Sequence, residues 1–505
     1  MLGTKPKAKG AVLARAARCL TSALLLTLAL PASAAPWAGV DDRTLRSDIE
    51  ILASRGLIDG VVTTWPIPAG QLQHLPNITR VAREPPYVQA AARRVLDWLT
   101  RSQGLKPTLD VRVASEPETV RDFGANARNQ VDAKAGLDWT GDWAAIGINV
   151  GEQARFNRDE KNFSLDGSYV SLDFANARIY GGYVDQWYGP GEISSLLLSN
   201  NARPFPKFGI MRDDPHAFET PWLSWIGPWQ VNFFVGLLDG PRVDRHTAFS
   251  SLRITFEPIN NLEIGLTRLT ELCGANHPCH PLKAWFHFRN DDRAGGVNET
   301  NEEAGIDFKY TLALHTISIS PYVQFMNEDT GPFTHSATSY LGGATMVGPF
   351  GDFSAHWRLT GEYTDSVATR NWFSFGDLFH GAAYNNGGYV DGFRYRDRTT
   401  GFSLDSDSHL LSVAGSITDS AGWMYRLVYH HARISTPELA AAQMSEPHTR
   451  NSVSSVPVTI NQVEAGLSVP WHGFTLEASL RGQDDQILPR HGKAIQGKAG
   501  IRYGF

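Results

Sequence analysis

The sequence predicts a mostly β protein: a transmembrane antiparallel β-barrel of about 18 strands, preceded by a small unit of three helices. Three observations predict this fold. The chain starts with an export leader and contains no later apolar run long enough for a transmembrane helix. Over residues 107–505 apolar residues recur with a period of two, the spacing of strands. Short and long connections alternate between these segments, which is typical of outer-membrane barrels.

Residues 1–34 predict a signal peptide. The apolar run 20–30 is too short to span a bilayer of about 30 Å as a helix. The small residues that follow it predict cleavage after Ala34 or one residue later. Cys19 lies before the apolar run rather than at its end, which argues against a lipid anchor. A basic stretch precedes the run: Lys5, Lys7, Lys9, Arg15 and Arg18.

The composition favours a large sheet and gives no sign of a nucleic-acid partner. The net charge is −6, and no basic helix of the kind that reads DNA is present. Aromatic residues make up 11 % of the chain and glycine occurs 47 times, which suits a large sheet with many tight turns.

Residues 36–105 predict three short helices that share one core. Asp41 or Asp42 can cap the first helix, and Gly56 ends it. Pro85 and Pro86 open the third. Their polar faces are expected to meet water, which places this unit in the periplasm. The apolar residues at helical spacing are Leu45, Ile49 and Leu52, then Leu72 and Leu75, then Val88, Ala92, Val95, Leu96 and Leu99.

The connections between the predicted strands set the orientation of the barrel. With both chain ends in the periplasm the strand count is even, so the short turns face the periplasm and the long stretches face outside. The short turns are 258–261, 348–351, 419–422 and 470–473, and the long polar stretches are 272–304, 327–338, 365–407 and 432–459. The sequence therefore predicts a protein of the Gram-negative outer membrane.

The last residues also alternate, and the chain ends in Phe505. A terminal strand of this kind resembles the signal read by the machinery that inserts bacterial outer-membrane barrels. Outer-membrane lipid and this insertion machinery are therefore expected partners.

Cys273 and Cys279 are the only cysteines after the leader. An oxidising compartment favours a disulfide that closes a small loop. A metal site with the neighbouring His277 and His280 is the alternative, and the absence of a second ligand pair argues against it.

Residues 185–229 form the most distinctive block. It contains Trp187-Tyr188-Gly189-Pro190-Gly191, then Ser199-Asn200-Asn201-Ala202-Arg203-Pro204, and ends at Gly227-Pro228-Trp229. It is too polar and too rich in proline for a strand in lipid, and irregular backbone at membrane depth must be buried or line a cavity. We expect part of 187–228 to fill the lumen, with Asn200, Asn201 and Arg203 bonded to inward-facing strand residues. An ordinary outer loop is the alternative.

This block resembles the Wzi family of capsule assembly proteins. The segments 45–66, 384–389 and 405–408 resemble it too, so the resemblance covers nearly all of the chain after the leader. It implies a periplasmic helical bundle, a barrel of about 18 strands, and lectin-like attachment of capsular or related exopolysaccharide to the cell surface. The family is not known for catalysis, so the resemblance implies no enzyme activity and carries over no catalytic residue. No cofactor and no metal are expected.

Two predicted outer loops carry residues suited to acidic sugars, since Arg binds carboxylates and aromatic rings stack on sugar faces. Rings at the membrane interface and solvated charges are the alternative for any single residue. The expected polysaccharide-binding residues are Trp285, Arg289, Trp372, Tyr384, Tyr389, Arg394, Tyr395, Arg396 and Arg398.

Two other functions stay open at this point. A diffusion channel would have an open lumen. A barrel-embedded hydrolase would need a nucleophilic Ser with a His, and no Gly-x-Ser-x-Gly motif marks one. Asp405 and Asp407 could bind Ca²⁺ only with several further oxygen ligands.

Overall fold

The computed structural model describes residues 36–505 with gaps. Left out are 74, 76–77, 102–103, 154–162, 276, 282–284, 286–299, 329–336, 352–353, 486, 488–493 and 505. The predicted leader, Phe505 and Arg289 therefore lie outside the described residues.

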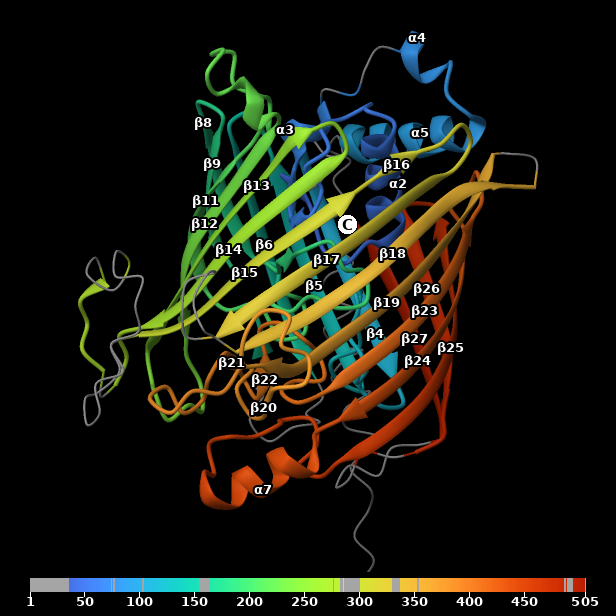
Figure 1. The fold of residues 1–505 in the computed structure, drawn as a ribbon. Coiled ribbons are helices and arrows are strands. Elements are labelled where there is room, and N and C mark those ends of the chain that lie inside the picture. Colours follow the sequence, from blue (N-terminus) through green and yellow to red (C-terminus); the bar gives the residue numbers. More distant parts are fainter. Residues whose placement is uncertain are drawn as a thin grey trace, which may run out of the picture.

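The described residues form a closed antiparallel barrel, which confirms the predicted fold class (Figure 1). The ring closes where β27 pairs with β4. Three two-residue strands, β7 (Phe163–Ser164), β16 (Leu312–Ala313) and β20 (Leu378–Phe379), join it. Its eighteen longer strands are β4 (Gly104–Ala114), β5 (Val131–Thr140), β6 (Ala144–Gln153), β8 (Tyr169–Phe174), β9 (Ala177–Gly182), β11 (Lys207–Arg212), β12 (Trp229–Leu238), β13 (Thr247–Ile259), β14 (Leu262–Leu272), β15 (Thr300–Tyr310), β17 (Ser318–Glu328), β18 (Thr338–Phe350), β19 (Ala355–Thr369), β23 (His409–Thr418), β24 (Met424–Ile434), β25 (Val458–Trp471), β26 (Phe474–Gln483) and β27 (Ile495–Tyr503).

The barrel wall is apolar outside and polar inside. In β6 the exposed residues are Ile146, Ile148 and Val150, while Asn149 and Gln153 are buried. This arrangement is the reverse of that in a water-soluble protein, where apolar side chains form the core. It matches a barrel whose outer face meets lipid and whose strands exchange all their hydrogen bonds within the ring.

Short turns lie at one end of the barrel and long connections at the other. The predicted turns 258–261, 348–351, 419–422 and 470–473 all fall at the short-turn end, between strands that pair as hairpins. One long connection also lies at this end: residues 213–228 join β11 to β12 and include the 3-10 helix η1 (Ser224–Ile226). Part of 187–228 was expected to fold inward, and residues 213–228 are not in that part.

The N-terminal helices occupy the mouth at the short-turn end (Figure 1). They are α2 (Arg43–Ser54), α3 (Ala69–Gln73), α4 (Ile78–Val81) and α5 (Pro86–Thr100). The Asp42 carboxylate caps α2 by accepting the Leu45 N–H at 2.9 Å, and Gly56 follows its end with a φ of +61°. Among the described residues no helix is long and apolar enough to cross a membrane.

The polar face of α2 does not meet water, contrary to expectation. Every residue from Leu45 to Ser54 is buried, because this helix enters the lumen. Its Glu50 carboxylate pairs with Lys309 of β15 at 3.2 Å and with Arg358 of β19. The lumen wall is polar, so a helix can bury a charged face there if each charge finds a partner. Leu96 of α5 is exposed, although its spacing placed it on the inner face.

Candidate functional site

Residues 183–206 leave the wall after β9, cross the lumen and return to β11. The wall holds this luminal segment through its backbone. The Glu362 carboxylate of β19 accepts the N–H groups of Glu192 and Ser194 at 2.8 and 2.7 Å. Gln324 of β17 accepts the Leu196 N–H at 2.9 Å. These bonds satisfy irregular backbone at membrane depth, as the absence of water there requires.

The Trp-x-Gly-Pro-Gly motif joins the luminal segment to the helical unit. β10 (Trp187–Tyr188) pairs with β2 (Thr64–Trp65), and the buried Trp187 indole donates to the Gly191 carbonyl at 2.9 Å. Arg46 of α2 donates to the Pro190 and Gly191 carbonyls at 3.2 and 3.0 Å. Gly189 has a φ of +124°, which L side chains rarely adopt.

The segment from Ser199 to Pro204 makes other hydrogen bonds than expected. Arg203 binds the Asp166 carboxylate at 3.1 and 3.2 Å, at the interruption between β7 and β8 in the wall. Asn200 donates to the Gly124 carbonyl and Asn201 to Thr399 of the short strand β22 (Arg398–Thr399), so neither bonds a strand of the barrel wall. Ser199 donates to the Gly401 carbonyl, and Pro204 is buried.

Residues 381–408 fold into the opposite mouth and form an outer lid. The Arg394 guanidinium lies at its centre, where Nε and Nη2 bind the Asp405 carboxylate at 2.9 and 2.5 Å. Arg394 also donates to the carbonyls of Tyr384 and Arg450 at 2.8 and 2.9 Å. Burial alone would raise the pKa of Asp405, but Arg394 outweighs it and holds that pKa below its usual value. Asp407 accepts from His380, Gly381 and Thr436, so its side chain is also part of this framework.

Four of the expected polysaccharide-binding residues are buried in the lid, which argues against the binding role expected for them. Tyr384 donates to the Leu196 carbonyl of the luminal segment at 2.6 Å, and Tyr395 donates to Asp239 at 2.9 Å. Tyr389 and Arg394 are equally inaccessible. Rings and guanidinium groups suit sugars, but the same groups also form the hydrogen bonds that hold a polar loop together. Here these side chains are buried by such bonds.

Two further candidates lie on the lipid-facing wall instead of the mouth. Trp285 packs against Phe233 at 5.4 Å between ring centroids, and Trp372 packs against Phe325 at 4.9 Å. Phe233 and Phe325 belong to the outward-facing set of their strands. Both Trp residues are therefore placed as membrane-interface rings, the alternative given above.

The disulfide joins Cys273 and Cys279 and clamps the lid from the side. His277, within the loop it closes, stacks on Tyr389 with ring centroids 3.8 Å apart. His277 Nε2 lies 3.0 Å from the Asp244 carboxylate, which also accepts the Val390 N–H at 2.9 Å.

Replacing Cys273 and Cys279 together by Ser is expected to loosen the lid without unfolding the barrel. Closing so small a loop is worth about 2 kcal/mol of chain entropy, so hydrogen exchange around Tyr389 and Val390 should accelerate roughly thirtyfold. Exchange followed by mass spectrometry on the purified protein measures this. Dithiothreitol should produce the same change in the parent protein, and unchanged exchange in both cases would refute the clamp.

The remaining expected residues, Arg396 and Arg398, lie at the outer mouth near three further residues, and the five together are the outer arginine cluster: Arg396, Arg398 and Arg450 with Asp239 and Asp397. The Arg396 side chain is only 7 % exposed, whereas that of Arg450 is 33 % exposed. Arg396 and Asp397 are the turn between β21 (Arg394–Tyr395) and β22 (Arg398–Thr399), with φ values of +52° and +59°. Arg396 lies 3.8 Å from Asp239, and Arg450 lies 3.7 Å from Asp397. Burial raises the pKa of Asp397, and Arg450 opposes this only partly. Three guanidinium groups that lie around one tight turn can recognise carboxylates.

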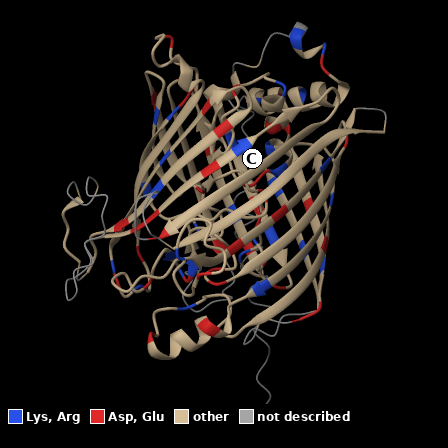
Figure 2. Cartoon of the chain, in the orientation of Figure 1, with Lys and Arg blue, Asp and Glu red and all other residues tan. Residues whose placement is uncertain are grey.

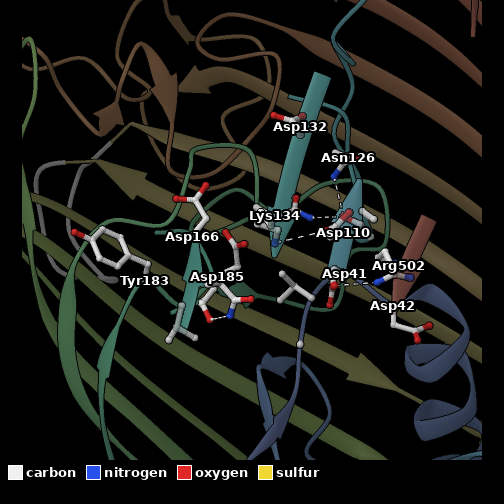
Figure 3. Close-up of a pocket in the computed structure, with 18 of the residues that line it drawn as sticks. Asp41, Asp42, Asp110, Asn126, Asp132, Lys134, Asp166, Tyr183, Asp185 and Arg502 are labelled. Carbon is white, nitrogen blue, oxygen red and sulfur yellow. Dashed lines mark hydrogen bonds and ion pairs between the residues drawn. The ribbon is translucent and has the colours of Figure 1, made fainter. Parts of the chain in front are cut away.

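A cavity of about 170 Å³ lies between the wall at β4–β6 and the luminal connections (Figure 3). Seven aspartates and four cations line it. Asp110 pairs with Lys134 at 3.5 Å, and Asp41 pairs with Arg502 at 2.9 Å. Figure 2 shows the same mixture of charges along the strands around the lumen. Carboxylates therefore outnumber cations around this cavity, which gives it a negative potential.

Within the part of the chain that the structure describes, one group has the residue types of a metal site: Asp59, Asp214 and His216. His216 Nδ1 lies 3.5 and 3.4 Å from the two carboxylates, and ion pairs account for this arrangement without a metal.

Residues 101–419 match the profile of the family described as capsule assembly protein Wzi. An uncharacterised 55.8 kDa protein from the cps region of Klebsiella pneumoniae is 30 % identical over 351 residues, which are 67 % of either chain. A solved Wzi from Escherichia coli, described as an outer-membrane, carbohydrate-binding β-barrel involved in group 1 capsule assembly, has a TM-score of 0.77 and 23 % identity. The match covers 93 % of this chain and 100 % of that one. The structure of OprD from Pseudomonas aeruginosa matches with a TM-score of only 0.44 and 10 % identity, over 79 % of this chain and 92 % of OprD.

Proposed function

Since the chain belongs to the capsule assembly protein Wzi family, we propose that it is an outer-membrane barrel that holds acidic capsular or related exopolysaccharide at the cell surface in a lectin-like manner. The end with the helical unit and the short turns faces the periplasm. The lid and the outer arginine cluster face outward, where the polymer lies.

One observation carries the proposal: both mouths of the barrel are closed by the chain itself, and the outer closure displays clustered guanidinium groups. The luminal segment and α2 fill the interior, and in the described cavity seven aspartates outnumber four cations. These features argue against passage of an acidic polymer and favour binding from outside. They also argue against a diffusion channel, which needs an open lumen.

The binding surface that we propose is the outer arginine cluster. An Arg–carboxylate contact at a water-accessible surface is worth about 0.5–1 kcal/mol, so three contacts repeated along a polymer support lectin-like avidity. Arg396 and Arg398 were expected to bind polysaccharide from the sequence. Arg450 was not, because it lies in another loop and only the fold brings it to the same turn.

Changing Arg396, Arg398 and Arg450 together to Gln is expected to release polysaccharide from cells while synthesis continues. The loss of three contacts should lower affinity about tenfold to hundredfold. The measurement compares cell-bound with shed polysaccharide, at constant total, in a deletion strain that expresses either the parent or the variant.

A matched control removes the same charge at the periplasmic end: Arg83, Arg93 and Arg101 to Gln, all exposed residues of the helical unit. This control should retain polysaccharide normally. If the outer variant also retains it normally, the outer arginine cluster is not the binding surface. If deleting the whole protein changes neither fraction, the proposed function itself fails.

A further inference from the structure

An exposed apolar patch lies on the connection between β19 and β20. Within residues 370–379, Phe373 and Phe375 are each 65 % exposed, and Leu378 and Phe379 are each 44 % exposed. Trp372 completes the patch. Four large apolar side chains so close together in water are unfavourable, and such patches mark contact with a partner or a membrane.

The patch does not point into the mouth but folds back along the outside of the barrel. Phe325 of β17 pairs with Tyr340 of β18 across the sheet, and both face outward, since their neighbours Gln324 and Leu341 are buried. Trp372 packs on Phe325, and Phe375 lies 5.3 Å from Tyr340 between ring centroids.

The depth of this contact follows from the strand geometry. Phe325 lies three residues before β17 ends at Glu328, so the patch reaches roughly 10 Å below the rim of these strands. It is thus continuous with the apolar outer face of the wall rather than with the outer arginine cluster.

Specific bonds hold the segment in this position. The Arg370 N–H donates to the Asp377 carbonyl at 2.9 Å, and their side chains form an ion pair at 3.1 Å. The Phe373 N–H donates to the Tyr340 hydroxyl at 3.3 Å. The Arg370–Asp377 pair is exposed, and the Arg370 guanidinium lies over the Phe379 ring with 5.0 Å between its Cζ and the ring centroid, so the segment combines exposed rings with one charged pair.

We propose that residues 370–379 insert into the outer leaflet and that the acyl chains of that leaflet are their partner. The inference rests on the proposed function, which places the barrel in the outer membrane. Insertion would anchor the outer lid to the membrane surface, because β20 leads directly into His380, which bonds Asp407 at 2.7 Å in the lid. A sugar partner fits less well, because the Trp372 ring packs against the rings of Phe325 and Phe373 and is not free to stack on a sugar face.

Site-directed fluorescence in lipid vesicles tests the proposal with the full-length protein. Phe375→Cys is labelled with an environment-sensitive nitrobenzoxadiazole dye, and Cys273 and Cys279 remain paired. The matched control is Met444→Cys, which is 88 % exposed in the outer helix α7 (Pro437–Ser445). We expect blue-shifted emission at position 375, quenching by doxyl lipids, and several-fold less quenching by aqueous iodide than at position 444.

A second control separates failure of this inference from failure of its premise. Ile148→Cys places the same dye on the outer wall of β6, where the native side chain is 57 % exposed. If the dye at 148 reports lipid while the dye at 375 responds to iodide as strongly as that at 444, the segment lies in water and the inference is overturned. If the dye at 148 also reports water, the barrel does not span the bilayer and both proposals fail.

Discussion

Replacing Arg394 by Met is expected to open the outer lid. The change leaves the Asp405 carboxylate buried without its partner and removes the donors that bind the Tyr384 and Arg450 carbonyls. Breaking a buried ion pair from one side typically costs about 3–5 kcal/mol. Hydrogen exchange over residues 381–408 should therefore accelerate by two to three orders of magnitude at least, while the strands keep their protection.

The double replacement of Arg394 by Met and Asp405 by Leu serves as the control. It removes both charges and leaves no buried ion unpaired, so part of the protection should return. Limited proteolysis of intact cells reports the same order of susceptibility: parent, then the double variant, then Arg394→Met. If Arg394→Met and the parent exchange at the same rate, the lid does not depend on this ion pair.

Replacing Glu362 by Ala is expected to release the luminal segment and open an ion-conducting path. This one carboxylate accepts N–H groups of Glu192, Ile193 and Ser194, and it also accepts the Tyr322 hydroxyl at 2.8 Å. Each hydrogen bond to a charged group is worth about 1.5–3 kcal/mol, so the loss of these bonds weakens the attachment of residues 192–194 to the wall. Planar bilayers should show open events that the parent protein lacks.

Two neighbouring changes test whether the effect comes from the lost acceptor. Glu362→Gln keeps one carbonyl acceptor and should open less often than Glu362→Ala. Thr364→Ala alters the next inward-facing residue of β19, which is buried and whose hydroxyl bonds none of the described residues of the luminal segment. This variant should conduct like the parent. Equal conductance in all four proteins would show that Glu362 does not hold the segment.

The closed lumen depends on many buried charges, so we expect it to be sensitive to substitution of any one of them. Arg253 of β13 binds the Asp307 carboxylate at 2.7 Å and also donates to Thr63 and Thr64 of the helical unit. Such networks hold when every member is satisfied and fail when one partner is lost. The helical unit is therefore fixed in the mouth by polar complementarity, whereas its own core is apolar.

The barrel could be predicted from the sequence because its signals are local. A strand that faces lipid on one side and a polar lumen on the other must alternate, as Ile146, Ile148 and Val150 do in β6. The short hairpin turns are also local signals, because each joins two strands that are adjacent in the sequence. The helix starts at Asp42 and Pro86 were likewise predictable, since caps and prolines act within one turn.

The binding residues could not be predicted in this way. Arg394 and Arg450 are of one chemical type and both lie in long connections, yet the Arg394 side chain is buried against Asp405 and that of Arg450 is one third exposed. Arg450 reaches the same turn from a different loop. Exposure in long connections depends on contacts between distant segments, which no local pattern encodes.

The sequence by itself determined that this chain closes a barrel in a membrane and which block enters it, because alternation and irregular, polar composition constrain the backbone directly. Only the tertiary structure decided which Arg, Tyr and Trp side chains remain available to a ligand. That choice depends on which buried carbonyls and carboxylates each side chain meets after the loops fold, as Tyr384 meets Leu196 and Arg394 meets Asp405.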